Sequence, residues 1–185
     1  IRFLFTPNFA MLELYPNTFE HFAKESRKGN VVPIVRSVLA DLHTPVGAYM
    51  SLAKDSKCSF LFESIEGCEK IARYSFLGAN PLFTVISKDS KTILRKNDGI
   101  KFVLDISLID FLREHFQKNR LAIRENLPPL CGGAVGFFGY DAARWFEKAL
   151  KNENKTSNED ASWMFYRNIL IFDRVKQRIE IVSIV

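Results

Sequence analysis

The sequence predicts an α+β fold built mainly from antiparallel β-sheet layers with flanking helices. Strand-like segments outnumber helical ones, and most of them follow one another through short turns instead of alternating with helices. The chain has 185 residues, 47% of them hydrophobic, which is enough for a substantial core. Its 17 Phe residues are best explained as packing within that core.

Capping and periodicity signals predict four helices. A hydroxyl or amide residue before an apolar-periodic run caps its first turn, Pro is favoured at the first helical position, and Gly ends a helix. In the second helix Val46, Tyr49, Met50 and Leu52-Ala53 share one face. The expected helices are residues 18–29 with Thr18 or Asn17 as cap and Gly29 at the end, the segment from Thr44-Pro45 to residue 55, residues 107–118 capped by Ser107, and residues 140–147.

Short runs of apolar residues bounded by turn signals predict the strands. The triplet Asn97-Asp98-Gly99 is typical of a hairpin turn. The polar segment 148–160 is expected to be a surface loop. The expected strands are residues 31–38, 59–63, 73–77, 82–87, 91–96, 100–105 and 131–139, followed by a long hairpin of 164–173 and 178–185 around Arg174.

The domain organisation is expected to be an N-terminal extension with a short helix (1–30), followed by one domain (31–185). The opening segment is apolar, but it lacks a charged n-region and a small-residue cleavage site, so it is not predicted to be a signal peptide. No apolar run is long enough to span a membrane. The three Cys form no C-x-x-C pair and no zinc-type cluster, which favours reduced thiols in a cytoplasmic protein.

The net charge of +5 is spread along the chain without a basic block. Proteins that bind nucleic acid or a membrane surface usually cluster their basic residues, so neither partner is expected. The charge instead allows some preference for small anions or an acidic partner.

No catalytic motif stands out. The run CGGAVGFFGYD (131–141) has four Gly but matches neither phosphate-binding pattern, and it favours a strand with close backbone approach. His21, His43 and His115 have no nucleophile motif beside them, and His115 lies on the apolar face of its helix.

Polar residues do interrupt the apolar run at residues 60–78, FLFESIEGCEKIARYSFLG. Glu63 offers a carboxylate for an ammonium group, and Ser64 offers a hydroxyl for a carboxylate. These are the needs of a free amino acid, which also requires an apolar wall. The alternative is that these groups only tie together the end of a sheet.

Four ordered blocks resemble the N-terminal region of anthranilate synthase component I, in the family of chorismate-utilising enzymes. They are ADLHTPVGAYMSL (40–52), the run at 60–78, LPPLCGGAVGFFGYDAARWFE (127–147) and MFYRNILIFD (164–173). The resemblance extends from about residue 31 to the C-terminus. Phe62 stands where the family usually has Leu, and Cys68 and Cys131 stand where small or polar residues are expected.

This resemblance implies a specific role. The family makes anthranilate from chorismate, with ammonia delivered by a glutamine amidotransferase subunit, with Mg²⁺ as cofactor, and under feedback control by L-tryptophan. Carried over, it points to Glu63 and Ser64 as tryptophan ligands with Pro45 and Val46 as wall, and to Arg73, Tyr74 and Ser75 as further candidates for the pocket. The chorismate and Mg²⁺ residues of the family lie in a C-terminal domain outside this chain, so no catalytic residue is expected here and the chain alone is expected to be inactive.

Three other hypotheses stay open. The first is the equivalent portion of aminodeoxychorismate synthase in the folate pathway, which shares the fold. The second is a stand-alone amino-acid-binding module without an enzyme. The third is a nucleic-acid-binding β domain, which binding to oligonucleotides at low salt would test.

Overall fold

The computed structural model describes residues 11–63, 73–88, 91–147 and 159–185. The chain folds into two units. Unit 1 takes its described residues from 1–80, 119–132 and 167–185, and unit 2 takes its own from 81–118 and 133–166. The chain therefore enters and leaves unit 1 more than once, and each unit is built from segments that are distant in sequence.

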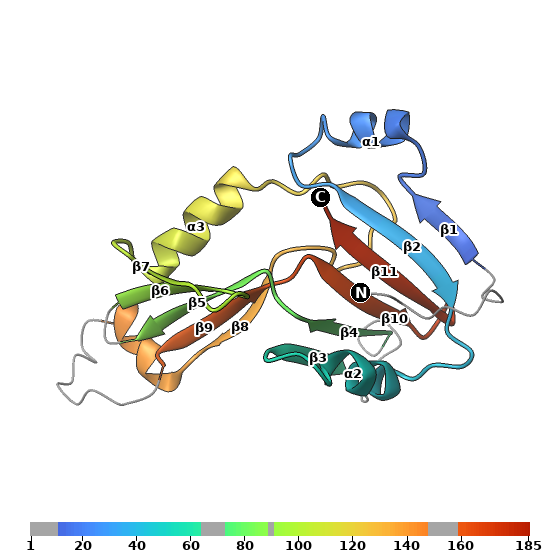
Figure 1. Ribbon diagram of the computed structural model, residues 1–185. Coiled ribbons are helices and arrows are strands. Elements are labelled where there is room, and N and C mark those ends of the chain that lie inside the picture. Colours follow the sequence, from blue (N-terminus) through green and yellow to red (C-terminus); the bar gives the residue numbers. More distant parts are fainter. Residues whose placement is uncertain (1–10, 64–72, 89–90, 148–158) are drawn as a thin grey trace. The chain divides into compact units, whose positions relative to one another are not determined.

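Unit 1 is built on a six-stranded antiparallel sheet (Figure 1). The sheet is accompanied by two helices, α1 (Phe19–Glu25) and α2 (Pro45–Ala53). The strands, in their order across the sheet, are β1 (Met11–Tyr15), β2 (Pro33–Leu39), β11 (Arg178–Ile184), β10 (Asn168–Asp173), β4 (Tyr74–Ala79) and β3 (Ser59–Glu63).

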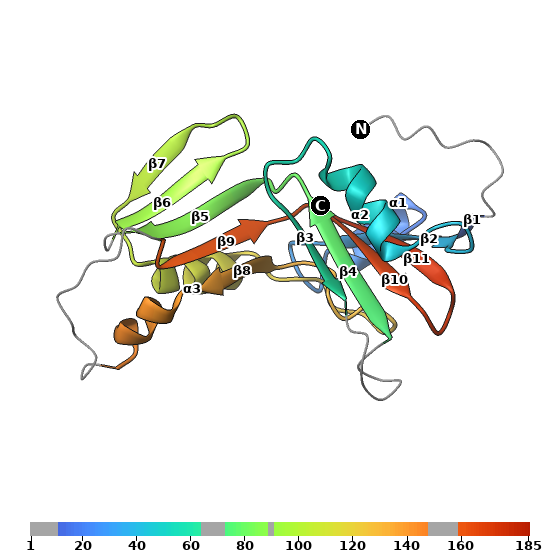
Figure 2. The ribbon, with the colours of Figure 1, turned by 90° about the horizontal axis from the view of Figure 1, so that it is seen from below.

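Helix α2 covers one face of this sheet at the β3–β4 edge (Figure 2). Its Ala48 and Leu52 pack against a core centred on Leu77 and Phe172. Thr44 caps the helix, since its side chain accepts the Gly47 N–H at 3.1 Å. Because side chains alternate along a strand, residues in register with Leu77 and Phe172 lie on the α2 face, and their chain neighbours lie on the opposite face.

Unit 2 is a five-stranded antiparallel sheet with helix α3 (Leu108–Lys118) and a short 3₁₀ helix, η1 (Tyr140–Trp145). Leu108 and Phe111 of α3 pack on a core around Val85 and Phe165. Ser107 caps α3, accepting the Asp110 N–H at 3.1 Å. The strand order is β7 (Lys101–Leu104), β6 (Lys91–Lys96), β5 (Phe83–Lys88), β9 (Ala161–Phe165) and β8 (Ala134–Phe138).

The predicted fold class is confirmed, because both sheets are antiparallel and the helices are few. The helix starts at Thr18, Thr44 and Ser107 and the hairpin at Asn97-Asp98-Gly99 are also confirmed. His115 lies half-buried against the rings of Phe83 and Phe165, as its place on an apolar face predicts. The predicted loop at 148–160 falls largely outside the described residues.

Several element predictions are wrong. The expected strand 164–173 is two strands, because β9 belongs to the unit 2 sheet and β10 to the unit 1 sheet. Tyr166, at the crossing, is only 1% exposed, so the apolar pattern continues through the break. Strand β1 was not expected, and α1 ends at Glu25, before Gly29. On α2, Val46 and Met50 are exposed, and Ala48 with Leu52 forms the packed face.

Candidate functional site

The end of strand β3 brings together two of the residues that the sequence singles out. Glu63 and Ser75 are directly opposite each other in the β3–β4 register. The Arg174 guanidinium forms an ion pair with the Glu63 carboxylate, and it donates a hydrogen bond to the Ser75 hydroxyl at 3.3 Å. A carboxylate, a hydroxyl and a guanidinium from three separate segments therefore meet at one sheet end.

Arg174 reaches this position because a neighbouring ion pair fixes the turn after β10. Asp173 is 2% exposed and accepts two hydrogen bonds from Arg73, at 3.0 and 2.6 Å. Asp173 Oδ1 also accepts the backbone N–H groups of Val175 and Lys176, each at 3.1 Å. The turn that carries Arg174 is thus held by one buried carboxylate.

The electrostatics of Asp173 follow from these contacts. Burial by itself raises the pKa of Asp173, but the hydrogen bonds from Arg73 and from the Lys176 N–H outweigh it, and the net pKa is lowered. Asp173 is therefore ionised at neutral pH. Burial also raises the pKa of Tyr74, and the negative charge of Asp173 adds to that effect, so the phenol stays neutral.

Strand alternation separates the further candidates Arg73, Tyr74 and Ser75. Ser75 is in register with Glu63 and Phe172, on the face that α2 covers. Tyr74 is in register with Asp173, on the opposite face. Arg73 donates to Asp173, and its guanidinium carbon lies 4.8 Å from the centre of the Tyr74 ring. Ser75 thus belongs to the Glu63 cluster. Arg73 instead forms the neighbouring ion pair with Asp173, and Tyr74 packs against Arg73.

Pro45 and Val46 form the first turn of α2, on the same sheet face as Glu63. A connection of only five residues joins α2 to β3, and the Tyr49 hydroxyl lies 3.1 Å from Ser59 Oγ at the start of β3. Helix α2 therefore runs back along β3, and its first turn points toward the end of β3 at which Glu63 lies (Figures 1 and 2). Val46 is 48% exposed, so its side chain is available to an occupant of this face.

Ser64 lies outside the described residues, so the structure places Glu63 but not the second half of the predicted pair. Sequence reasoning missed Arg174 as a partner, because it stands 111 residues from Glu63 and looks like an ordinary hairpin-turn cation. Asp173 carried a weak signal, since it ends the block MFYRNILIFD. Neither contact can be read from local sequence.

The arrangement carries charges of the kind that complement a small zwitterion. Glu63 provides a negative charge, Arg174 a positive one and Ser75 a hydroxyl, and these groups complement an ammonium and a carboxylate. Across the described ranges, no three His, Cys, Asp or Glu side chains converge to form a metal site. None of the helices described is long and apolar enough to cross a membrane.

Comparison with known proteins gives relatives that are named as anthranilate synthase subunits. No family model matches the chain. Anthranilate synthase component 1 of Acetivibrio thermocellus is 36% identical over 170 residues, which cover 91% of this chain and 34% of the relative. The protein of the same name from Synechocystis sp. is 33% identical over 163 residues, which cover 87% of this chain and 32% of the relative. Anthranilate synthase alpha subunit 2 of Arabidopsis thaliana is 31% identical over 196 residues, which cover 98% of this chain and 31% of the relative.

The chain thus spans about a third of the length of the curated relatives it matches. A crystal structure of anthranilate synthase component I from Streptococcus pneumoniae aligns with 78% of this chain and 30% of that one, at 29% identity and a TM-score of 0.49. The resemblance that the four sequence blocks indicate is confirmed by the sequence relatives.

Proposed function

We propose, from its relationship to anthranilate synthase component I, that this chain is the tryptophan-binding regulatory portion of such a synthase. The names of the relatives support the tryptophan pathway over the folate alternative. The full-length protein would convert chorismate and ammonia to anthranilate and pyruvate, with a glutamine amidotransferase subunit as partner and a C-terminal domain for chorismate.

The observation that carries the tryptophan proposal is the cluster of Glu63, Ser75 and Arg174 beside the first turn of α2. In the proposed complex the ammonium of L-tryptophan faces Glu63, and its carboxylate faces Ser64 and Arg174. Pro45 and Val46 lie against the indole. The ion pair supports this proposal because a zwitterion presents the same two charges in complementary order.

Binding requires the ligand to share Glu63 with Arg174. Arg174 follows Asp173 on the turn between β10 and β11, so a change at the pocket reaches that turn. We propose that tryptophan stabilises one of two states of the full-length protein, and that this state has a poorer chorismate site.

The expectation of Mg²⁺ as a cofactor rests only on the family resemblance. Within the described part of this chain no set of three acidic, His or Cys side chains fits a metal ion. We propose that its ligands lie outside these residues.

The test is thermal unfolding with and without L-tryptophan. A ligand at about 100 times its dissociation constant stabilises the folded state by about 2.7 kcal/mol. For a chain of this size the midpoint should rise by roughly 5–10 °C. We expect Glu63→Gln and Ser64→Ala to abolish most of the shift, and Glu159→Gln, an exposed acid in unit 2, to keep it.

In the full-length protein Glu63→Gln and Ser64→Ala should each relieve inhibition by tryptophan, while the reaction rate without tryptophan is unchanged. A shift that survives both variants, or inhibition unchanged in both, would contradict the assignment of the site.

A further inference from the structure

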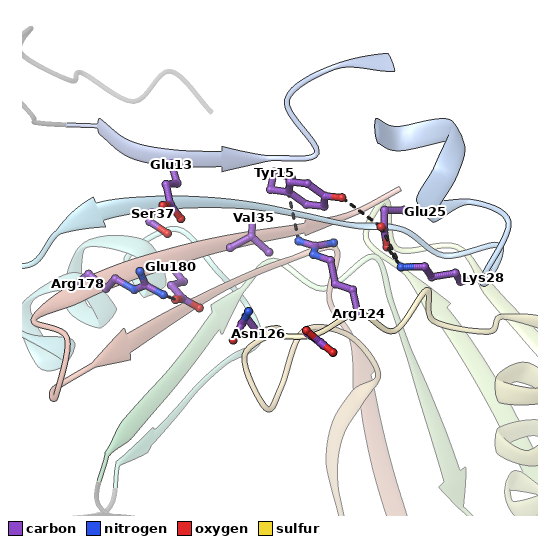
Figure 3. Close-up of a pocket in the computed structure, with 11 residues that line it drawn as sticks. Glu13, Tyr15, Glu25, Lys28, Val35, Ser37, Arg124, Asn126, Arg178 and Glu180 are labelled. Atoms are coloured by element: carbon purple, nitrogen blue, oxygen red, sulfur yellow. Dashed lines mark hydrogen bonds and ion pairs between the residues drawn. The ribbon is translucent and has the colours of Figure 1, made fainter. Parts of the chain in front are cut away.

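A second site lies on the opposite face of the unit 1 sheet. A cavity of about 540 Å³ is formed there by strands β1, β2 and β11, by the end of α1 with Lys28 shortly after it, and by the loop at 124–126 (Figure 3). This volume is within the usual range for small-molecule sites. None of the residues predicted from the sequence lines it, and Glu63 belongs to the α2 face.

One wall of the cavity is fixed by contacts within the protein. Glu25 is 2% exposed and accepts hydrogen bonds from Lys28 at 3.0 Å and from the Tyr15 hydroxyl at 3.2 Å. Arg124 donates to the Pro33 carbonyl at 3.0 Å, and its guanidinium lies 4.4 Å from the centre of the Tyr15 ring. These groups stabilise one another, so they hold the wall in shape and do not require an occupant.

The floor is different, because a buried donor there lacks an acceptor. Arg178 donates from its Nη2 to Glu180 at 2.5 Å, but its Nε is buried and has no hydrogen-bond partner among the described residues. A buried N–H without an acceptor is costly, so such groups usually meet a water, an ion or a ligand. Arg178 lines the cavity, and its side chain as a whole is 20% exposed, so a cavity occupant can approach its guanidinium.

The sheet register arranges the other polar groups in a row. Glu13 on β1 and Glu180 on β11 both pair with Ser37 on β2, so the three stand in a row at spacings of about 4.8 Å (Figure 3). The short Ser37 side chain between two longer glutamates leaves the hollow. Glu13 is exposed, and in the described structure no cation lies within ion-pair distance of it.

The next row on the same face is apolar. Tyr15 and Val35 are register partners, two residues along each strand from Glu13 and Ser37, and both line the cavity. The cavity therefore offers the carboxylate of Glu13, and it offers the Arg178 guanidinium and the Ser37 hydroxyl from neighbouring strands. Tyr15 and Val35 form its apolar wall.

We propose that this cavity binds a free L-amino acid with an apolar side chain. Its carboxylate faces the Arg178 guanidinium and the Ser37 hydroxyl, its ammonium faces Glu13, and its side chain lies on Tyr15 and Val35. The cavity lining contains four Glu against Lys28, Arg124 and Arg178. That balance favours a zwitterion over a simple anion.

The test uses L-leucine and L-phenylalanine as probes, measured by calorimetry on the Glu63→Gln variant so that the proposed tryptophan site does not contribute. We expect at least one probe to bind with a dissociation constant in the millimolar range or below. 4-Methylpentanoate and isopentylamine, which each keep only one charge of leucine, should bind about tenfold more weakly or worse.

Glu13→Gln should weaken binding by about fivefold or more, and Glu20→Gln, an exposed acid on α1 that does not line the cavity, should leave it unchanged. Ser37→Leu should fill the hollow and abolish binding. The proposal is overturned if neither amino acid binds at about 10 mM, if Glu13→Gln and Ser37→Leu both bind like the parent, or if one single-charge analogue binds as tightly as the amino acid. Because Glu13 is exposed, its variant should fold normally, and a failure of tryptophan binding at Glu63 would not affect this result.

Discussion

Asp173 is one buried side chain that organises the candidate site through its contacts within the protein. It receives Arg73 from the start of β4 and the backbone of its own turn, and so fixes the place from which Arg174 reaches Glu63. A carboxylate that is 2% exposed is costly to bury unless it is paired in this way. The Arg73–Asp173 pair is therefore expected to contribute to the stability of the fold.

Asp173→Asn should lower the free energy of unfolding by about 2–3 kcal/mol at neutral pH, because Arg73 loses its charged partner and one oxygen acceptor is replaced by a donor. Chemical denaturation measures this change. Asp41→Asn, at an exposed position, should stay within about 0.5 kcal/mol of the parent.

The same pair predicts the pH dependence. The pKa of Asp173 is lower in the folded chain than in the unfolded one, so its stabilising contribution is present above the unfolded pKa of about 3.9. That contribution is lost as the pH falls through the folded pKa. The difference in unfolding free energy between the parent and Asp173→Asn should therefore shrink as the pH falls below about 4. A constant difference would mean that Asp173 is not stabilised as an anion.

At the scale of elements, strand β8 depends on glycine for its pairing. A Cβ added at Gly136 would lie 2.1 Å from the Ser162 carbonyl oxygen and 2.7 Å from the Trp163 Cα of β9. Both atoms are backbone and cannot move without opening the β8–β9 ladder. This close approach agrees with the structural interpretation of the CGGAVGFFGYD run and with its lack of a phosphate-binding pattern.

Gly136→Ala should therefore destabilise unit 2 strongly, by about 2–4 kcal/mol, comparable to other severe steric changes in a packed region. Gly132→Ala is the matched control in the same run, because its nearest neighbours are side-chain methyl groups of Leu121 and Ile184 at 3.2 and 3.6 Å, which can shift. Amide hydrogen exchange should show lost protection in β8 and β9 for the first variant. Equal effects of the two variants would contradict the steric argument.

At the scale of the whole molecule, each unit has its own sheet and its own core, built from segments distant in sequence. Strands β3, β4, β10 and β11, which carry or adjoin the Glu63 cluster, all belong to unit 1. Regulation by tryptophan, as proposed, would reach the catalytic part of the full-length protein through this unit.

Such coupling has to be reciprocal. If tryptophan weakens chorismate binding by some factor, chorismate must weaken tryptophan binding by the same factor, typically about 5- to 150-fold. Calorimetric titration of full-length protein with tryptophan, with and without saturating chorismate, measures this coupling factor.

Arg174→Gln should change the coupling factor more than Arg167→Gln, because only Arg174 contacts Glu63. Arg167 is the matched control, an exposed arginine directly before β10. An identical factor in both variants would contradict a role for Arg174 in the coupling.

The sequence by itself determined the fold class, the helix caps at Thr18, Thr44 and Ser107, most strand positions, and the polar interruption of an apolar run at Glu63; the first turn of α2 joined the candidate site only through the family resemblance. These features are local, because turn chemistry, capping and periodicity act over a few residues. Only the tertiary structure decided that β9 and β10 belong to different sheets, that Arg174 pairs with Glu63, that Ser75 and Tyr74 face opposite sides, and that Glu13, Ser37 and Glu180 line one cavity. Each of these depends on which distant strands become neighbours and in what register, and long-range pairing leaves no periodic trace in the sequence.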